Sequence, residues 1–219
     1  MAITLILLAV FLLADIFTKY FAEVLIAKND IVTAIPGVLD LTLTYNTGAA
    51  WSLFDDNTLF LAILSLVASI VIIVFIMKND WKTKKIYSLS TCMLLAGTFG
   101  NMIDRFLTVF DLREGVVDMI ILNPLDSLWS AIFKSRFPIF NVADVLLVLG
   151  VILLAIDILF LEDKREKKIK SNINKQIAER NKEESKDVEQ ITEANEEEAI
   201  VERKVLIIEE TTYGKSSSE

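Results

Sequence analysis

The sequence predicts an all-α membrane protein with four transmembrane helices in residues 1–161 and a charged tail in residues 162–219. Hydrophobic residues make up 53% of the chain, and its mean hydropathy of +0.50 is high for a soluble domain. Four apolar runs approach the roughly 20 residues that cross a bilayer. Much of the charge lies after residue 161, so the net charge of −8 says little about the apolar part.

The residue types that are absent from the sequence exclude several kinds of active site. The sequence has no histidine and one cysteine, Cys92, inside an apolar run. A Ser-His-Asp triad, a Cys-His pair and a metal site with imidazole ligands are therefore excluded, and Cys92 is interpreted as a packing residue. Acid–base chemistry would depend mainly on carboxylates, and neither a metal nor a cofactor is expected.

Residues 2–23 form the first apolar segment and contain Asp15 and Lys19. A signal peptide is the alternative, but the segment has no basic start and no small-residue cleavage site, which favours a transmembrane helix. Asp15 and Lys19 are four residues apart, so they share a helical face and can form an ion pair. That pair is either a structural feature near the membrane surface or part of a functional site.

Residues 24–57 are predicted to be an extended segment outside the membrane. Residues 35–37 are Ile-Pro-Gly, a turn signal. Residues 39–45 alternate apolar and polar side chains, which predicts a strand. Residues 46–54 combine small residues with Asn, Trp and Phe, which suits the membrane interface.

The second and third helices are predicted at residues 58–77 and 86–106. Gly97 and Gly100 should allow another helix to approach closely. The third helix ends with Asn101, Asp104 and Arg105. These polar groups are either a helix end closed by an Asp–Arg pair or part of a functional site.

Residues 107–136 are predicted to be a second outer loop, with a short strand at 116–120 that carries Asp118. The fourth helix, at 139–161, has Asp144 near its start. Asn141 precedes Asp144 by three residues, so one interpretation is an N-cap with an acid facing the helix dipole. Another is a catalytic dyad, since four helices would bring Asp118 and Asp144 to the same face. Two neighbouring carboxylates can share a proton, activate water and protonate a leaving amine.

The distribution of lysine and arginine predicts the orientation. The loop at 78–85 has four lysines, and the segment at 164–170 is strongly basic, whereas residues 24–57 contain only Lys28. By the positive-inside rule both termini are cytoplasmic. Asp118, Asp144 and the Asp15–Lys19 pair then lie near the outer leaflet.

The tail differs in composition from the rest of the chain. Residues 162–219 are rich in Lys and Glu and contain no proline. They have too little apolar surface for a core, so we expect a flexible cytoplasmic tail, helical in parts. A short apolar patch at 205–208 could dock elsewhere.

Five short motifs between residues 15 and 144, in order, resemble the signal peptidase II family, the prolipoprotein signal peptidases of bacteria. They are Asp15-Ile-Phe-Thr18-Lys19, Asn46-Thr-Gly48-Ala-Ala-Trp-Ser, Gly100-Asn101-Met-Ile-Asp104-Arg105, Val116-Val117-Asp118 and Phe140-Asn141-Val-Ala143-Asp144. Each motif alone is a weak signal, and the ordered set is a strong one. Three features depart from the family pattern: Trp51 replaces the usual Phe, the connection at 105–116 is longer, and the tail is additional.

The resemblance implies an intramembrane aspartic endopeptidase that removes signal peptides from diacylglyceryl-modified prolipoproteins, cleaving before the lipidated cysteine. It implies a small extracytoplasmic β-cradle in the first outer segment, and Asp118 and Asp144 as the catalytic residues. The implied supporting and substrate-binding residues are Asp15, Lys19, Asn46, Gly48, Asn101, Asp104, Arg105 and Asn141. The expected partners are lipid-modified precursors and membrane lipids, without nucleic acid, and the chain is expected to be a monomer in the bacterial cell membrane.

Two other classes of function can place polar groups in a membrane. A small transporter or channel would line an ion path with them, but transporters often show repeated broken helices, and the two halves of this sequence are not similar. A non-enzymatic anchor for the tail leaves the outer polar groups unexplained. Replacing Asp118 or Asp144 with Asn separates the three, because a peptidase loses turnover, a transporter loses flux and an anchor is unaffected.

Overall fold

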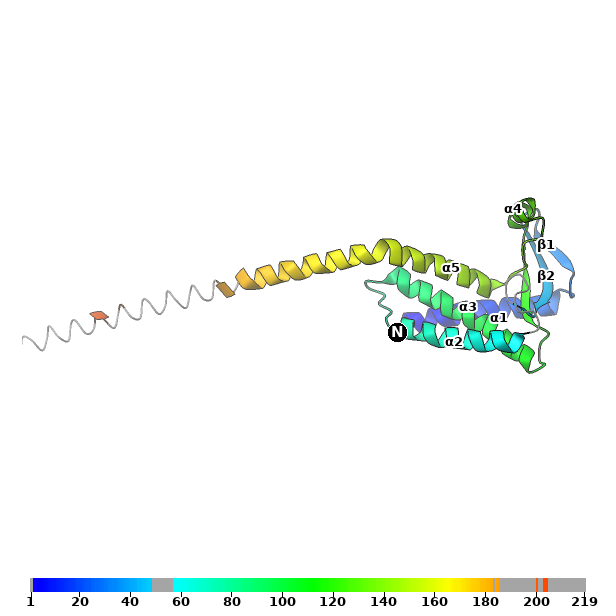
Figure 1. The fold of residues 1–219 in the computed structure, drawn as a ribbon, viewed down its shortest axis with the longest axis horizontal. Helices are drawn as coiled ribbons and strands as arrows, with labels where there is room; N and C mark the ends of the chain where they lie inside the picture. The colour runs from blue at the N-terminus through cyan, green and yellow to red at the C-terminus, as the bar shows by residue number, and fades with distance from the viewer. Residues whose placement is uncertain (1, 49–56, 183, 186–199, 201–202, 205–219) are drawn as a thin grey trace, which may run out of the picture. The chain divides into compact units, whose positions relative to one another are not determined.

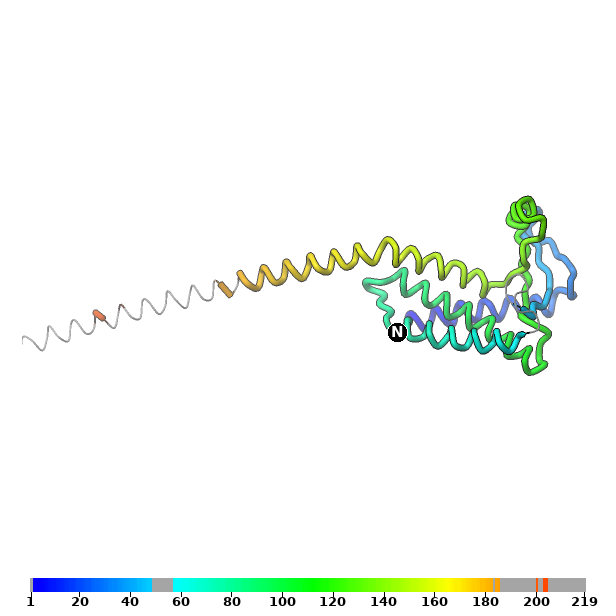
Figure 2. Tube along the Cα trace, viewed as in Figure 1, coloured from blue at the N-terminus to red at the C-terminus, as the bar shows by residue number. Residues whose placement is uncertain are grey.

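Four helices in the described part of the chain are long and apolar enough to cross a membrane: Ala2–Leu25, Thr58–Ile76, Lys85–Val109 and Val142–Lys182. The computed structural model describes residues 2–48, 57–182, 184–185, 200 and 203–204. The chain divides into two units, Met1–Glu162 and Asp163–Glu219, and the first contains the membrane bundle and a small sheet (Figures 1 and 2). The predicted helical membrane protein with four spans is confirmed.

Helix α3 (Lys85–Val109) lies at the centre of the bundle and packs against α1 (Ala2–Leu25), α2 (Thr58–Ile76) and α5 (Val142–Ile156) (Figure 1). Its glycines allow this approach, as the sequence predicted. A Cβ atom at Gly97 would lie 2.6 Å from the carbonyl oxygen of Ala143, and one at Gly100 would overlap the Asp15 carboxylate. The small residues of α3 therefore bring α1 and α5 close to the same segment of one helix.

An antiparallel sheet stands at one end of the bundle, with the strand order β1 (Ile31–Ile35), β2 (Leu39–Asn46) and β3 (Val116–Leu122) (Figure 1). The predicted turn joins β1 to β2: Val38 N donates to Ile35 O over 3.0 Å, and Gly37 has a φ of +72°, which glycine adopts without strain. Both predicted strands are confirmed. In the register of β2 with β3, Thr44 lies opposite Asp118.

A small apolar cluster fastens the sheet to the bundle. Leu43 of β2 and Val117 and Met119 of β3 pack together with Ala22, which lies in the last turns of α1. The side chains of Val117 and Asp118 point to opposite faces of β3, as neighbours in a strand do. Packing Val117 against α1 therefore determines the face on which Asp118 emerges.

The predicted start of the fourth helix at residue 139 is wrong. The helix begins at Val142, because Asn141 caps it and Phe140 is still extended. Phe140 forms a bridge with Ile120 of β3, in which Ile120 N donates to Phe140 O over 2.8 Å. The end of the fourth run, Asp157–Leu161, is a short π-helical segment, η2. The third helix reaches Val109, three residues beyond its predicted end.

The second outer loop contains a helix that the sequence reasoning missed, α4 (Asn123–Phe133). A proline lies in its first turn, and it ends at Lys134 in the left-handed conformation. The signal was present, since the apolar residues at 125, 128, 129, 132 and 133 have helical spacing.

In the second unit, residues 163–182 are helical. Helical parts were expected in the tail, and these residues form one. The predicted apolar patch at 205–208 lies outside the described residues. So does most of the segment predicted at the interface, of which only 46–48 are described.

Candidate active site

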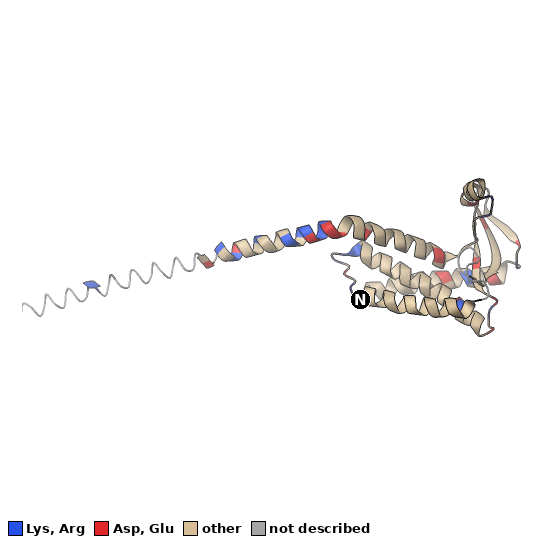
Figure 3. Ribbon diagram, viewed as in Figure 1, with Lys and Arg blue, Asp and Glu red and all other residues tan. Residues whose placement is uncertain are grey.

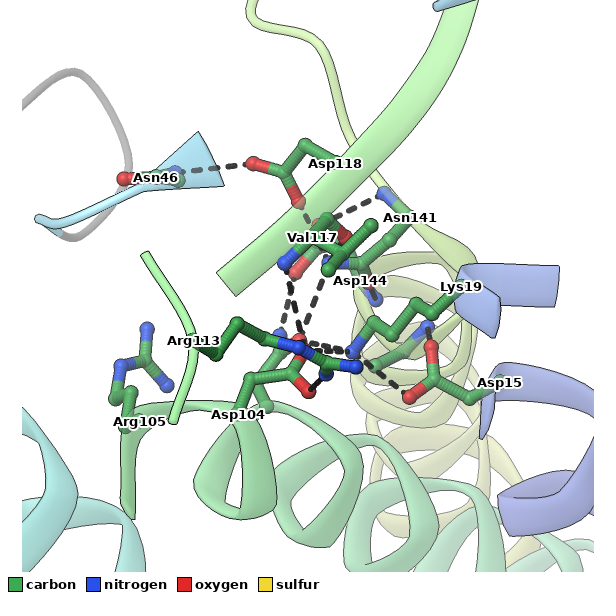
Figure 4. A network of polar contacts seen from close by, with 12 residues as sticks. Asp15, Lys19, Asn46, Asp104, Arg105, Arg113, Val117, Asp118, Asn141 and Asp144 are labelled. Carbon is green, nitrogen blue, oxygen red and sulfur yellow. Dashed lines mark hydrogen bonds and ion pairs between the residues drawn. The ribbon is translucent and has the colours of Figure 1, made fainter. Parts of the chain in front are cut away.

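The polar residues singled out in the sequence come together where the sheet meets the bundle (Figure 4). Helix α1 contributes Asp15 and Lys19, strand β3 contributes Asp118, and the start of α5 contributes Asn141 and Asp144. The other members lie at the end of β2 and in the second half of α3: Asn46, Asn101, Asp104 and Arg105.

The Lys19 ammonium group is the buried centre of the cluster, with a side-chain exposure of 2%. It forms ion pairs of 2.8 Å with Asp15 Oδ2 and of 2.8 Å with Asp104 Oδ2. It also donates to Asn101 Oδ1 over 3.1 Å, so each of its three protons has an acceptor. The predicted Asp15–Lys19 pair is confirmed, and it is part of a network that crosses from α1 to α3.

Lys19 determines how the Asn101 carboxamide is oriented. An ammonium group only donates, so the carbonyl oxygen of Asn101 must face it. The amide nitrogen then faces α5, where Nδ2 donates to Asp144 Oδ1 over 2.8 Å. Because an ionised carboxylate only accepts, this arrangement suits a charged Asp144.

Asn141 is both the cap of α5 and the link between the two acids. Its Oδ1 accepts from Asp144 N over 3.0 Å, and its own N donates to Asp144 Oδ2 over 3.1 Å, which completes a capping box. The amide Nδ2 therefore faces the sheet and donates to Asp118 Oδ1 over 2.6 Å. The same nitrogen lies 3.2 Å from Val117 O and 3.1 Å from Asn101 Oδ1, so its two protons serve three acceptors. The predicted N-cap is confirmed, and it coexists with a polar site.

Asp118 is enclosed, with an exposure of 3%. Its second oxygen, Oδ2, accepts from Asn46 Nδ2 over 3.1 Å (Figure 4). Gly48 N donates to Asn46 Oδ1 over 3.0 Å, which turns the amide of Asn46 toward the acid. Asp144 is only half-buried, so the pair can be reached from its side.

The environment of Asp118 favours its neutral form. Burial raises the pKa of this carboxyl group from 3.8 to about 7, and the nearby charge of Asp144 acts in the same direction. The hydrogen bonds from Asn46 and Asn141 oppose the rise. Near neutral pH, Asp118 can therefore hold or release a proton, the property that general acid–base chemistry requires.

Asp104 does not pair with Arg105, contrary to one of the two interpretations of this helix end. Neighbouring residues of an α-helix point about 100° apart, so a side chain rarely meets the next one. Asp104 pairs instead with Lys19 and with Arg113, and its Oδ2 accepts from Val117 N over 3.4 Å. Arg105 points toward α2, where its Nη1 donates to Ser65 Oγ over 3.2 Å.

Two residues of this network were missed in the sequence. Arg113 binds Asp104 and forms a 2.7 Å ion pair with Glu23 of α1, whose other oxygen accepts from Tyr45 over 3.3 Å. Glu23 follows Lys19 by four residues, as Lys19 follows Asp15, so the shared helical face was a usable signal. Arg113 had no such signal, because it lies in the connection between α3 and β3.

Within the described ranges, no group of three or more His, Cys, Asp or Glu side chains is placed to hold a metal ion. Asp15 and Asp104 are close enough to share a cation, and the Lys19 ammonium group fills the position between them. The cluster is thus built from carboxylates, carboxamides and basic side chains.

Comparisons with known proteins find similarity across most of the membrane bundle. Residues 7–160 match the family model described as signal peptidase (SPase) II. A lipoprotein signal peptidase of Enterococcus faecalis is 38% identical over 73% of this chain and 89% of that protein. One of Deinococcus radiodurans is 40% identical over 63% of this chain and 69% of its own length.

Two solved structures have the same fold. They are bacterial membrane enzymes determined by the in meso method at 2.3 and 1.9 Å resolution, each 31% identical to this chain, with TM-scores of 0.61 and 0.60. They cover 73% and 74% of this chain, and 88% and 95% of their own lengths are matched. The family match covers nearly the whole bundle, from the second turn of α1 to the π-helical segment η2. The chain therefore belongs to the signal peptidase II family.

Proposed function

We propose that this chain is an aspartic endopeptidase that removes signal peptides from diacylglyceryl-modified prolipoproteins, cleaving before the lipidated cysteine, with Asp118 and Asp144 as its catalytic pair. The observation that carries the assignment is the double role of Asn141, which binds Asp118 through its side chain and Asp144 through the capping box. Two carboxylates joined in this way occupy unlike environments, as acid and base roles require. The relatives named lipoprotein signal peptidase support the choice of substrate.

The two acids divide the work. In the resting site Asp118 carries the proton and Asp144 carries the charge. Asp144 takes a proton from a water molecule as the water oxygen attacks the scissile carbonyl carbon, while Asp118 donates a hydrogen bond to the carbonyl oxygen. When the tetrahedral intermediate collapses, the C–N bond breaks and the pair supplies a proton to the departing amine. The products are a carboxylic acid and an amine, and the site returns to one proton and one charge.

The other polar residues hold this pair in place. Asn46, oriented by Gly48, and Asn141 direct amide protons at Asp118, while Asn101, oriented by Lys19, does the same for Asp144. Asp15 Oδ1 accepts from Ala143 N over 2.9 Å and so anchors the start of α5. Asp104 anchors the backbone just before Asp118. Arg105 has a buried Nε without a hydrogen-bond partner in the described chain, which makes this group a candidate to bind a substrate carbonyl.

The same proposal includes topology and assembly. Both termini lie in the cytoplasm and the catalytic pair lies near the outer leaflet, as the lysine distribution indicates. Reporters fused after residues 130 and 170 test this, with the first expected outside and the second inside. The reverse result would place both aspartates on the wrong side of the membrane. We also expect the chain to act as a monomer.

The decisive experiment is incubation of the purified protein with a lipidated precursor and measurement of its size shift. Three precursors are compared: the lipidated form, an unlipidated form, and one in which Ser replaces the lipidated cysteine. Cleavage of the lipidated form alone, lost in Asp118→Asn and Asp144→Asn proteins that still bind precursor, is the expected result. Cleavage that persists in both variants would overturn the catalytic assignment.

A further inference from the structure

The helix at residues 163–182 carries one apolar stripe on an otherwise polar surface. Its large apolar side chains are Ile169, Ile173 and Ile177, and they are 52%, 48% and 52% exposed. A spacing of four residues advances about 40° around a helix, so the three side chains fall within an arc of about 80°. Figure 3 shows that charged residues recur along this segment. The apolar face of an amphipathic helix usually packs against another surface, so we expect this stripe to have a binding partner.

The charge of the same segment is strongly one-sided. Residues 163–182 contain eight lysines and arginines and three acids. At least two basic residues are neutralised locally, since Lys170 pairs with Glu166 over 3.5 Å and Arg180 with Glu184 over 3.2 Å. A clear positive surplus remains. The residues that follow, 183–219, have the opposite balance, with twelve acids and four basic residues.

The position of the segment in the chain indicates which surface lies within reach. Residues 163–182 come directly after the fourth apolar run and continue its helix, Val142–Lys182, so this segment lies where the chain leaves the membrane. The headgroups of anionic phospholipids attract basic side chains at that depth, and an isoleucine stripe suits the boundary of the acyl chains. Long lysine and arginine stems can bend toward the headgroups from the flanks of the stripe.

A second copy of the same helix is a less suitable occupant. A coiled-coil seam alternates steps of three and four residues, whereas Ile169, Ile173 and Ile177 are separated by four and four. Pairing two copies would also bring two positively charged helices together.

We infer that residues 163–182 form an interfacial helix that binds the anionic phospholipids of the membrane leaflet next to the fourth span. The isoleucine stripe enters the acyl boundary and the basic residues contact headgroup phosphates. The acidic residues 183–219 are repelled by the same surface, so binding is confined to the basic segment. The inference rests on the proposed topology only in naming this leaflet as cytoplasmic.

Spin labels on the full chain in lipid nanodiscs test the inference. In a Cys92→Ala background, one label is attached through Ile173→Cys on the stripe, and a matched label through Ser171→Cys, about 160° away around the helix. Collision rates with oxygen, which dissolves in lipid, and with an aqueous nickel chelate are measured in phosphatidylcholine discs and in discs that also contain phosphatidylglycerol. With phosphatidylglycerol present, the label at 173 should shift toward oxygen while the label at 171 stays open to nickel.

A charge variant checks the cause of the shift. Replacing Lys164, Lys167 and Lys168 with Gln should reverse the oxygen shift at residue 173, and 1 M salt should do the same, because it shortens the screening length to about 3 Å. Equal nickel access at 171 and 173 in every disc would overturn the inference. So would a label at 173 that is shielded from both probes and shows dipolar broadening between copies, since that result identifies a second copy as the occupant. Precursor cleavage is assayed separately, and its loss would count against the proposed function alone.

Discussion

Helices α2 and α3 belong to the same bundle but differ in which side chains they bury and which they expose. The more apolar of the two is the less buried: 28% of the residues in the most apolar stretch of α2 are buried, against 67% in α3. Within the described chain, α3 has no exposed large apolar side chain, whereas α2 exposes ten or more, among them Leu64, Val67 and Ile70. Apolar side chains are stable in contact with lipid and gain little from burial in the bundle. The interior of the bundle therefore holds the polar groups, which cannot form hydrogen bonds with lipid.

The buried positions of α3 follow this rule. They are mostly small or polar: Ser88, Ser90, Thr91, Gly97, Thr98, Gly100, Asn101 and Asp104. Asn101 and Asp104 carry the site, and their contacts with Lys19 of α1, Asp144 of α5 and Val117 of β3 each join two elements. The comparison predicts large effects for substitutions inside α3 and its partners, and small effects for substitutions on the lipid-facing surface of α2.

The largest expected effect is on turnover. Asp118→Asn and Asp144→Asn should each lower the rate of precursor cleavage by about 10²–10⁴-fold, the usual contribution of a general acid or base. The control, Leu64→Ala on the lipid-facing side of α2, should leave the rate unchanged. Rates measured at saturating precursor in the same detergent provide the test. A Leu64→Ala protein as slow as the aspartate variants would show that the comparison between the helices is mistaken.

The same two variants distinguish the roles of the acids. Asp118→Asn leaves the carboxyl group at the helix N-terminus, and Asp144→Asn leaves the carboxyl group in the buried strand. In Asp144→Asn we expect the Asp118 carboxyl group to titrate above the ordinary value of 3.8, because burial in the strand raises its pKa. The infrared carboxyl stretch measured against pH is the test, and an Asp118 carboxyl group that ionises at the ordinary value of 3.8 would contradict its role as the proton-bearing acid.

Removing the centre of the polar network should chiefly cost stability. Lys19→Ala leaves Asp15 and Asp104 without their shared cation, and breaking a buried ion pair from one side costs about 3–5 kcal/mol. Lower accumulation in the membrane and a lower unfolding temperature in detergent are the expected readouts. A Lys19→Ala protein of normal stability that does not cleave precursor would instead indicate a direct catalytic role.

The stability cost of one added carbon atom should differ between α3 and α2. In α3, Gly100→Ala places a methyl group against the Asp15 carboxylate and Ala143, so overpacking should cost about 1–3 kcal/mol. In α2, Val67→Ile adds the same volume toward lipid and should cost almost nothing. Thermal unfolding of both proteins in the same detergent measures the difference. Equal losses would mean that α2 also faces a packed partner.

The smallest expected effect is a pH dependence of the cleavage rate, which we attribute to the pair Asp118 and Asp144. The pKa of Asp118 is raised to about 7, so its proton is retained below that pH and lost as the pH rises through it. Cleavage should therefore decline above about pH 7, approaching tenfold per unit where a single proton is limiting. Asp144→Asn removes the charge that helps raise this pKa, so the remaining carboxyl group should titrate at a lower pH than in the parent protein. A rate that stays flat from about pH 6 to about pH 9, a range that includes this pKa of about 7, would contradict the role of Asp118 as the proton-bearing acid.

Local sequence was enough for the parts that depend on local chemistry. The four spans follow from apolar length, strand β2 from alternation, the turn from Pro36 and Gly37, and the cap of α5 from the spacing of Asn141 and Asp144. The Asp15–Lys19 pair follows from a four-residue step. The catalytic roles of Asp118 and Asp144 came from family resemblance and remain predictions.

Tertiary structure alone decided which polar groups meet. Asp104 binds Arg113 and Lys19 rather than its neighbour Arg105, and Asn101 is oriented by a lysine 82 residues away. Such choices depend on which side chains reach the same enclosed volume, and helical spacing specifies a face without specifying its partner. The face of β3 on which Asp118 emerges was likewise set by Val117 packing against α1. The sequence by itself determined where the chain crosses the membrane and which polar groups it carries. Packing around α3 determined how those groups are paired, because a buried charge must be paired with a group on one of the elements that surround it.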